Sequence, residues 1–241
     1  MPDVSKSLTD QAVSAIRSGI IDLTLAPAAR IDESMLLTKF GLGRTPAREA
    51  LNRLAAEGFV SIIQNRGGVF VRGLDLPEMM DILVAQQVAE NLLGNLLDWS
   101  DATLPDDLAA IQARYRKVIG SGEYLEITAL NEEFHLRMHR ALGNSFIYSF
   151  ARSTHRHVRR LNVYIYRLES ATPADQREQF ARNACEHDQI IDLIRQRTRD
   201  PLAALLNQHA RTAQERLLHV LHSATSPFPL DVSPGDPSAE L

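Results

Sequence analysis

Between residues 44 and 57 the hydrophobic positions repeat with the period of an α-helix. The positions that share one face of this helix are Ala47, Ala50, Leu51 and Leu54. Thr45 offers a capping hydroxyl and Pro46 follows it, which is typical of a first helical turn, so we expect the helix to begin there. Gly58 is expected to end it, because glycine readily takes the backbone conformation found just after a helix. The pattern predicts a helix with one buried face and one polar face.

The residues that follow have the pattern of a β-hairpin. Val60 to Ile63 is a short run rich in branched hydrophobic residues, and Val69 to Val71 can form the returning strand. Between them, Asn65 to Gly68 supplies turn-forming residues. A helix followed at once by a hairpin is the layout of a winged-helix DNA-binding domain.

Positive charge is concentrated in this segment. Residues 42 to 72 contain five arginines against two glutamates, although the whole chain has a net charge of -4 and a pI near 6.1. Arg44, Arg48 and Arg53 lie at the start and flank of the predicted helix, and Arg66 lies at the expected tip of the hairpin. Guanidinium groups make bidentate contacts with phosphates and guanine edges. The pattern favours double-stranded DNA as a partner; the alternative is a solvated helix face in a domain that does not bind DNA.

Helical periodicity takes over after a turn-rich joint at residues 72 to 77. The predicted helices are 77–98, 105–119, 123–141, 145–168, 175–196 and 201–222. Asp200 before Pro201 is predicted to cap the last of them. We therefore expect a mainly α protein with three segments: an N-terminal winged helix-turn-helix domain with a small β-hairpin at 1–73, an antiparallel α-helical bundle at 77–222, and a disordered tail at 223–241.

Length and composition agree with two modest domains, since the chain has 241 residues and is 44% hydrophobic. It has no apolar run long enough to cross a membrane and no charged-then-apolar leader, so we expect a cytoplasmic protein without a membrane partner. Cys185 is the single cysteine and cannot form an intramolecular disulfide. We expect it to be a buried structural thiol.

Four polar residues of the predicted bundle are spaced so that folding could bring them together: Asn131, His135, His187 and His209. The first two are four residues apart and share a helix face, and the other two lie on two later helices. Three imidazoles with an amide oxygen suit zinc, nickel or a similar divalent ion. Spacing alone is weak evidence, because the chain contains eight histidines. We interpret His139, His155 and His157 as surface or cavity-rim residues.

An enzymatic function finds little support. Glu132 to His135 contains one Glu-x-x-His element of the kind found in di-iron bundles, but that chemistry needs a second one. None of the other seven histidines has a glutamate three residues before it. The chain also lacks a Gly-x-Ser-x-Gly elbow, a P-loop and a Gly-x-Gly-x-x-Gly fingerprint. We expect a protein that is not an enzyme and keep a metal-dependent helical-bundle enzyme as the less favoured alternative.

The segment from residue 8 to 72 resembles the DNA-binding domain of the GntR family of bacterial transcription regulators. The matching residues are Arg44-Thr45-Pro46-Ala47-Arg48-Glu49-Ala50-Leu51, Glu57-Gly58 and Arg66-Gly67-Gly68. Residues 16 to 27 correspond to the first helix and its approach, and residues 33 to 40 to the second helix. The resemblance implies operator contacts by Arg44, Thr45 and Arg48 from the recognition helix and by Arg66 and Gly67 from the wing. Mild departures at Ala28 and at Leu42-Gly43 remove no charged contact.

Most of residues 77 to 222 is similar to the FCD effector domain of FadR-type members of that family. The marker aspartate, two residues, phenylalanine, histidine is matched by Asn131 to His135, with His187 and His209 following. The resemblance implies a divalent metal, zinc or nickel, at Asn131 and the three histidines. Asn131 stands in the aspartate position, so a bound cation has one ligand charge fewer and is expected to bind less tightly.

The same resemblance implies an effector cavity inside the bundle. Gln86 stands where many members carry an arginine, and Arg137 is a candidate to replace that charge. Tyr164 is a candidate for the cavity wall, although an aromatic residue in a bundle helix is more often part of the core. We therefore expect a homodimeric, operator-binding repressor controlled by a small metabolite, an organic acid or a related oxygen-rich compound. The alternative is an architectural or effector-independent DNA-binding protein.

Overall fold

The computed structural model describes residues 7–63, 68–168 and 173–223. The chain divides into two compact units, the first ending at Asp75 and the second beginning at Leu76. The predicted disordered tail, beyond Ser223, lies outside the described residues. So do Arg66 and Gly67 of the predicted wing.

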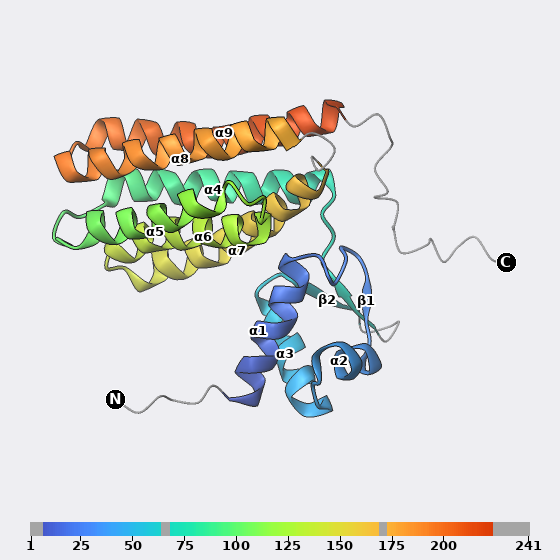
Figure 1. The fold of residues 1–241 in the computed structure, drawn as a ribbon. Coiled ribbons are helices and arrows are strands. Elements are labelled where there is room, and N and C mark those ends of the chain that lie inside the picture. Colours follow the sequence, from blue (N-terminus) through green and yellow to red (C-terminus); the bar gives the residue numbers. More distant parts are fainter. Residues whose placement is uncertain (1–6, 64–67, 169–172, 224–241) are drawn as a thin grey trace. The chain divides into compact units, whose positions relative to one another are not determined.

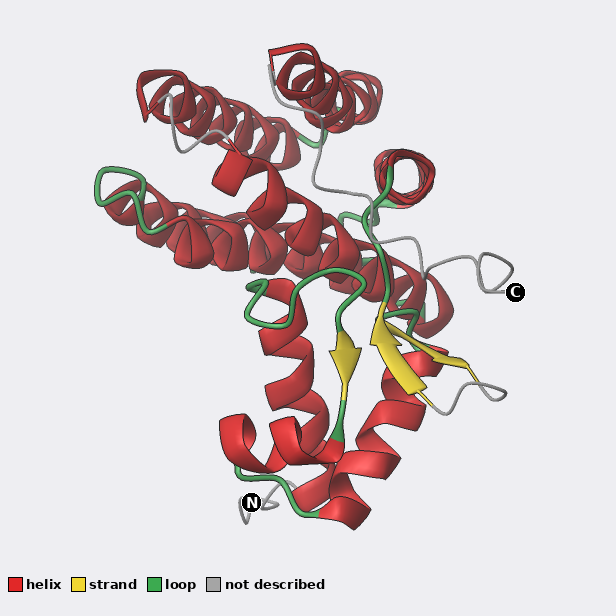
Figure 2. Cartoon of the chain, turned by 90° about the vertical axis from the view of Figure 1, so that its right-hand side faces the viewer, coloured by secondary structure: helices red, strands yellow, loops and turns green. Residues whose placement is uncertain are grey.

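The first unit is a helical domain with a small sheet. Its described elements are α1 (Leu8–Ile21), β1 (Arg30–Ile31), α2 (Glu33–Phe40), α3 (Arg44–Ala56), β2 (Val60–Ile63) and β3 (Gly68–Val71). The strands form an antiparallel sheet in the order β1-β3-β2, with Arg30 opposite Phe70 and Val60 opposite Val71 (Figure 2). The predicted helix and hairpin strands are confirmed, and β1 adds a strand that the pattern did not predict.

Helix α3 begins two residues earlier than predicted, and its cap differs. Gly43 occupies the N-cap position without a side-chain hydrogen bond, so the prediction that Thr45 caps this helix is wrong. Thr45 and Pro46 instead lie within the first turn, where proline is tolerated because the backbone N–H groups there have no partner within the helix. Gly58 follows the helix with a φ of 78°, as expected of a glycine at a helix end.

The core of the first unit fixes α3 against α1. The helices bury Ile16, Ile20 and Leu54 completely. Phe59, directly before β2, is also fully buried in this core. Arg17 of α1 donates two hydrogen bonds to the carboxylate of Glu57, at 2.9 and 2.8 Å, just after α3 ends. This core leaves the opposite side of α3 free to carry polar residues.

The second unit is a bundle of long antiparallel helices (Figure 1). Its described elements are α4 (Leu76–Leu96), α5 (Leu104–Val118), α6 (Tyr124–Ala141), α7 (Ser145–Leu168), α8 (Pro173–Gln196) and α9 (Arg199–Ser223). The helices pack in a closed ring, because α4 contacts α9 and α7, α5 contacts α6 and α8, α6 contacts α7, and α8 contacts α9. All of them can therefore present side chains to one common interior. The predicted helical bundle is confirmed.

Helices α4 and α9 approach each other closely at Gly94. A Cβ atom on Gly94 would lie 2.7 Å from the Cα atom of Ala203, so only glycine fits there without a shift. Arg199 holds the same end of the pair together, since its guanidinium donates to the carbonyl oxygens of Asn95 at 2.5 Å and Leu97 at 2.8 Å.

Two local predictions for the bundle are wrong. Helix α9 begins at Arg199, with Asp200 inside its first turn, because the N–H of Leu202 already bonds to the carbonyl of Thr198. Cys185 is exposed on α8, because the buried face of this helix is formed by Ala184 and His187. Among the described residues, no helix is both long and apolar enough to cross a membrane.

Candidate functional site

The outward side of α3 carries a basic groove. Arg44, Thr45 and Arg48 are exposed on this helix. Arg44 and Arg48 line a groove of about 490 Å³ between α3 and the sheet, which is also lined by Asn52. Arg30 of β1 lines the same groove and was not predicted from the sequence, because its position depends on the pairing of β1 with β3. Three guanidinium groups therefore face one concave surface, a geometry suited to a polyanionic backbone.

Arg53 is placed differently from the other predicted DNA contacts. Its Nη1 lies 2.8 Å from Oδ1 of Asp10 on α1, and Thr9 donates to Glu49 one turn earlier on α3. Arg53 is thus held on the flank of α3 that faces α1. It does not line the basic groove.

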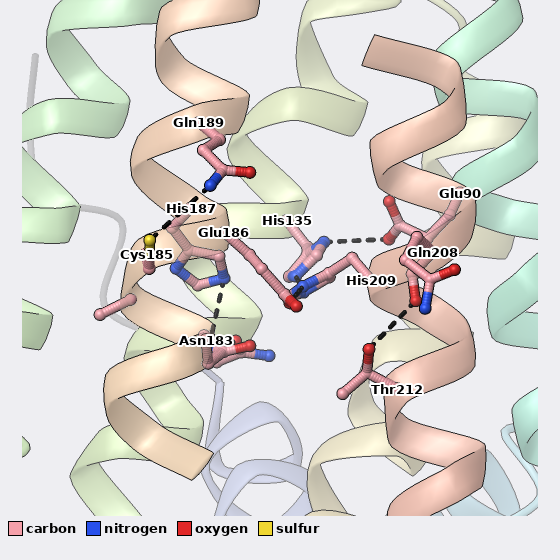
Figure 3. A network of polar contacts seen from close by, with 12 residues as sticks. Glu90, His135, Asn183, Cys185, Glu186, His187, Gln189, Gln208, His209 and Thr212 are labelled. Atoms are coloured by element: carbon pink, nitrogen blue, oxygen red, sulfur yellow. Dashed lines mark hydrogen bonds and ion pairs between the residues drawn. The ribbon is translucent and has the colours of Figure 1, made fainter. Parts of the chain in front are cut away.

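Inside the bundle, three histidines from three helices converge. His135 of α6, His187 of α8 and His209 of α9 are all buried, and their candidate ligand atoms lie within 4.8 Å of one another. Nε2 of His209 lies 3.2 Å from Nε2 of His135. Figure 3 shows His135 and His209 meeting between the helices, with His187 beside them. The structure thus brings together the three imidazoles that the sequence singled out.

Each of these histidines has an outward partner at Nδ1. Oε1 of Glu90 lies 2.9 Å from Nδ1 of His135, Oε2 of Glu186 lies 2.5 Å from Nδ1 of His209, and Oε1 of Gln112 lies 3.1 Å from Nδ1 of His187. Acceptors at Nδ1 favour the tautomer whose Nε2 carries a free lone pair. The Nε2 atoms of His135 and His209 then face each other, whereas Nε2 of His187 faces the side-chain amide of Asn183.

Asn131 is connected to this cluster by the side chain of Asn183. Its Oδ1 accepts a hydrogen bond from Nδ2 of Asn183 at 3.0 Å, and the same Nδ2 lies 3.4 Å from Nε2 of His187. The amide oxygen of Asn131 is therefore linked to the imidazoles through the side chain of Asn183. Three nitrogen ligands and one oxygen ligand form a donor set that fits zinc or nickel.

Burial sets the protonation of the cluster. It lowers the pKa of His135, against the opposing effect of Glu90, and it lowers the pKa of His187 well below the usual value. Burial alone would raise the pKa of Glu90, but the charge and contact of His135, with His139 and His155, hold that pKa well below its usual range. His135 and His187 are therefore favoured in the neutral form that binds metal, and Glu90 is favoured as a carboxylate.

A polar cavity of about 50 Å³ lies next to the cluster. Asn131, His209 and Gln86 form part of its wall. The wall includes further side-chain amides and two arginines: Asn162, Gln179, Asn183, Arg182 and Arg216. Arg216 lies over the ring of Tyr166, with its Cζ 3.9 Å from the ring centroid.

The structure places the other predicted effector contacts away from this cavity. Arg137 pairs with Asp101 at 2.7 Å and with Asp107 at 2.8 Å. Neither Arg137 nor Tyr164 belongs to the cavity wall. Arg182 and Arg216 line the cavity instead. The sequence contained a signal for Arg216, because it follows His209 by two helical turns.

Two histidines lie in a different environment from the one that the sequence predicts. His139 and His155 are buried beside Glu90 rather than exposed at a surface or rim. Nε2 of His155 lies 3.2 Å from Oε1 of Glu90, and burial lowers the pKa of His155 to about 4. Glu90 itself was not predicted as a site residue. Its relation to these histidines depends on how α4 packs against α7, which no spacing within one helix reveals.

A winged helix with a basic groove and a bundle with a polar interior define a DNA-binding transcription regulator with a ligand-sensing domain. The chain matches the model of the bacterial regulatory proteins of the gntR family over residues 8–71 and the model of the FCD domain over residues 97–212. It belongs to the GntR family and carries an FCD domain. It is a transcription regulator and not an enzyme.

Curated relatives and a solved structure agree with this assignment. The chain is 28% identical over 205 residues to the Nta operon transcriptional regulator of Aminobacter aminovorans, covering 83% of this chain and 90% of the relative. It is 32% identical over 81 residues to the transcriptional repressor GlaR of Escherichia coli, covering 34% and 36%. The structure of E. coli McbR/YncC has the same fold, with a TM-score of 0.71 and 18% identity over 90% of this chain and 98% of that one.

Proposed function

We propose that this regulator is a repressor that binds a near-palindromic operator as a homodimer and releases it when a small organic acid binds in the bundle beside a divalent metal. The observation that carries this proposal is the cluster of three buried imidazoles, one of which, His209, lies in the wall of a cavity that also contains two arginines. The similarity to the GlaR repressor supports repression as the mode of action.

The donor set explains how a metal would be held. His135, His187 and His209 would supply nitrogen, and Asn131 would supply an oxygen in place of a carboxylate. Because Asn131 is neutral, the negative charge would come from Glu90 and Glu186, which lie against the Nδ1 atoms of two ligands. When bound, the metal would supply a positive centre for a carboxylate of the effector.

The cavity wall suits an oxygen-rich acid. Arg182 and Arg216 can form charge-assisted hydrogen bonds with a carboxylate, and the surrounding amides can both donate to and accept from hydroxyl or carbonyl oxygens. A volume of about 50 Å³ admits only a few water molecules. Binding of a metabolite would therefore require Arg216 to move away from Tyr166, which would change the packing of α9.

The basic groove would read DNA. Arg44 and Arg48 would contact base edges or phosphates from α3, Thr45 would support them, and Arg30 would add a phosphate contact from β1. A homodimer would present two such surfaces to two half-sites, since two-fold protein symmetry imposes two-fold symmetry on the operator.

Coupling between the two ligands tests the proposal. Fluorescence anisotropy with DNA flanking its own gene gives the operator affinity, and a thermal-shift screen of organic acids with the zinc-loaded protein identifies an effector. The effector should lower operator affinity, and operator should lower effector affinity by the same factor, about 5- to 150-fold. Effector affinity that is identical with and without operator would contradict regulation by this route.

A further inference from the structure

Gln86 of α4 is a buried residue whose amide oxygen has no hydrogen-bond partner. The residue is 4% exposed, and its Oε1 atom is shielded from solvent and unpaired among the described residues. The next residue of the helix, Gln87, shows the contrast, since its Nε2 donates to Oδ1 of Asn207 on α9 at 2.5 Å. A buried amide without a partner lowers stability, because it loses its bonds to water and gains none in return. A hydrophobic side chain at position 86 would avoid this cost.

Gln86 belongs to the wall of the cavity that the proposed function assigns to the effector. Two other acceptors of this wall are already engaged. Oδ1 of Asn131 accepts a hydrogen bond from Asn183 at 3.0 Å, and Oε2 of Glu186 lies 2.5 Å from Nδ1 of His209. The unpaired acceptor of Gln86 is therefore suited to a group that a ligand brings into the cavity and that donates a hydrogen bond.

The charges of the wall decide which donor such a ligand carries. Arg182 and Arg216 favour a carboxylate and disfavour a second positive group, so an ammonium is a poor donor here. An ionised carboxylate only accepts hydrogen bonds. A hydroxyl is neutral, donates a hydrogen bond, and adds a single heavy atom in a cavity of about 50 Å³. The wall thus fits a carboxylic acid that also carries a hydroxyl group.

We propose that Gln86 selects a hydroxy acid as the effector by accepting a hydrogen bond from its hydroxyl group at Oε1. This inference rests on the proposed function, because it takes the same cavity as the effector site. A hydroxy acid gives Oε1 a donor, whereas a keto acid offers only an acceptor and a deoxy acid offers neither. A site with a buried unpaired group rejects an analogue that cannot pair with it.

Matched acids test the proposal. Isothermal titration calorimetry with the full-length, zinc-loaded protein compares lactate, pyruvate and propanoate, which share one carbon skeleton, and the corresponding mono- and dicarboxylic acids of four to six carbons. We expect a hydroxy acid to bind about 5- to 150-fold more tightly than its keto and deoxy counterparts. Gln86→Leu should bring this ratio close to one. Gln87→Leu is the matched control and should keep the ratio, because Gln87 lies outside the cavity wall.

The other outcomes separate this inference from the proposed function. An acid that binds equally well with and without a hydroxyl leaves the proposed function standing and overturns the selection by Gln86. A preference for hydroxy acids that persists in Gln86→Leu shows that another group, such as the metal, recognises the hydroxyl, and it also overturns the role of Gln86. If no acid binds the wild type, both the proposed function and this inference fail.

The stability of the ligand-free protein gives a second test. Leucine fills position 86 without an unpaired amide, so Gln86→Leu should unfold at the same urea concentration as the wild type or at a higher one. Gln87→Leu should unfold at a lower concentration, because it loses the hydrogen bond to Asn207. A lower midpoint in Gln86→Leu would show that the amide stabilises the ligand-free fold, and it would overturn the proposal.

Discussion

Nε2 of His209 lies 3.2 Å from Nε2 of His135, although 74 residues separate them in the chain. The two rings stack with centroids 5.1 Å apart, and each ring is oriented by a carboxylate at its other nitrogen. Two neutral imidazoles held in this way gain little from each other. A divalent cation bound by both imidazoles, as we propose, would account for this arrangement.

The carboxylate behind His209 should tune metal affinity. Glu186→Gln removes the charge that lies 2.5 Å from Nδ1 of His209, so we expect zinc affinity to fall by about 10- to 100-fold. Competition dialysis against a chelator of known affinity measures the change. Glu178→Gln, on the same helix but with an exposed carboxylate, is the control and should leave zinc affinity unchanged. Equal affinities in both variants would show that Glu186 does not act through His209.

Restoring a carboxylate at position 131 should strengthen the site. Asn131→Asp adds one negative charge beside the three histidines, and a divalent cation binds a charged oxygen more tightly than an amide. We expect higher zinc affinity by the same dialysis measurement. Asn162→Asp places the same charge in the wall of the neighbouring cavity and controls for a general electrostatic effect. A gain in Asn162→Asp that matches the gain in Asn131→Asp would contradict direct ligation by residue 131.

The sequence predicted the fold well where local patterns determine structure. The helices of the bundle were placed within a few residues of their observed ends, because proline, glycine and hydrophobic periodicity act locally. Caps were less predictable: Thr45 and Asp200 both lie one or two residues inside their helices. Side-chain preference for a cap is small beside the tertiary packing that sets where each helix begins.

Only part of the candidate site could be predicted, because some of its residues are brought together by contacts between distant elements. His135, His187 and His209 were found because they match a spaced motif, whereas Glu90, His155 and Arg30 depend on contacts between elements far apart in the chain. A histidine such as His155 has the same sequence signature whether it is buried or exposed. Only the packing of α7 against α4 and α6 decides between these states.

Arg48 and Arg53 should differ in their effect on DNA binding. Arg48 lines the basic groove, so Arg48→Ala should weaken specific operator binding by roughly 1 to 3 kcal/mol if it contacts a base edge. Arg53 is already paired with Asp10, so Arg53→Ala should have a smaller effect. Fluorescence anisotropy with operator and shuffled DNA over a salt series separates specific from electrostatic binding. If Arg53→Ala weakens operator binding as much as Arg48→Ala, the assignment of the groove is wrong.

The close approach of α4 and α9 predicts a stability effect. Gly94→Ala places a Cβ atom 2.7 Å from the backbone of Ala203, and overpacking of this kind costs about 1 to 3 kcal/mol. The better helix propensity of alanine offsets about 1 kcal/mol of this. We therefore expect a lower urea midpoint. Gly120→Ala is the control, because no neighbouring atom lies within 4 Å of its added Cβ. An unchanged midpoint in Gly94→Ala would mean that the two helices separate without cost.

The metal-free protein should lose stability as the pH falls. Burial lowers the pKa of His155 from 6.5 to about 4 in the folded chain, so the unfolded chain binds more protons between these values. The contribution of His155 to the free energy of unfolding is therefore fully present above about pH 6.5 and decreases as the pH falls towards 4. From about pH 7 to about pH 5 this one group should remove about 2 kcal/mol from the free energy of unfolding, and His135 and His187, whose pKa values are also lowered, act in the same direction.

Urea unfolding of the chelator-stripped protein at several pH values measures this slope, and His155→Gln identifies its source. Glutamine does not titrate in this range, so the variant should show a flatter pH dependence than the wild type, whatever its absolute stability. Zinc should raise the stability of the wild type without flattening this dependence, because a bound cation also keeps the imidazoles of the folded chain unprotonated while those of the unfolded chain still titrate. Equal slopes in the metal-free wild type and His155→Gln would show that His155 is not held neutral by burial.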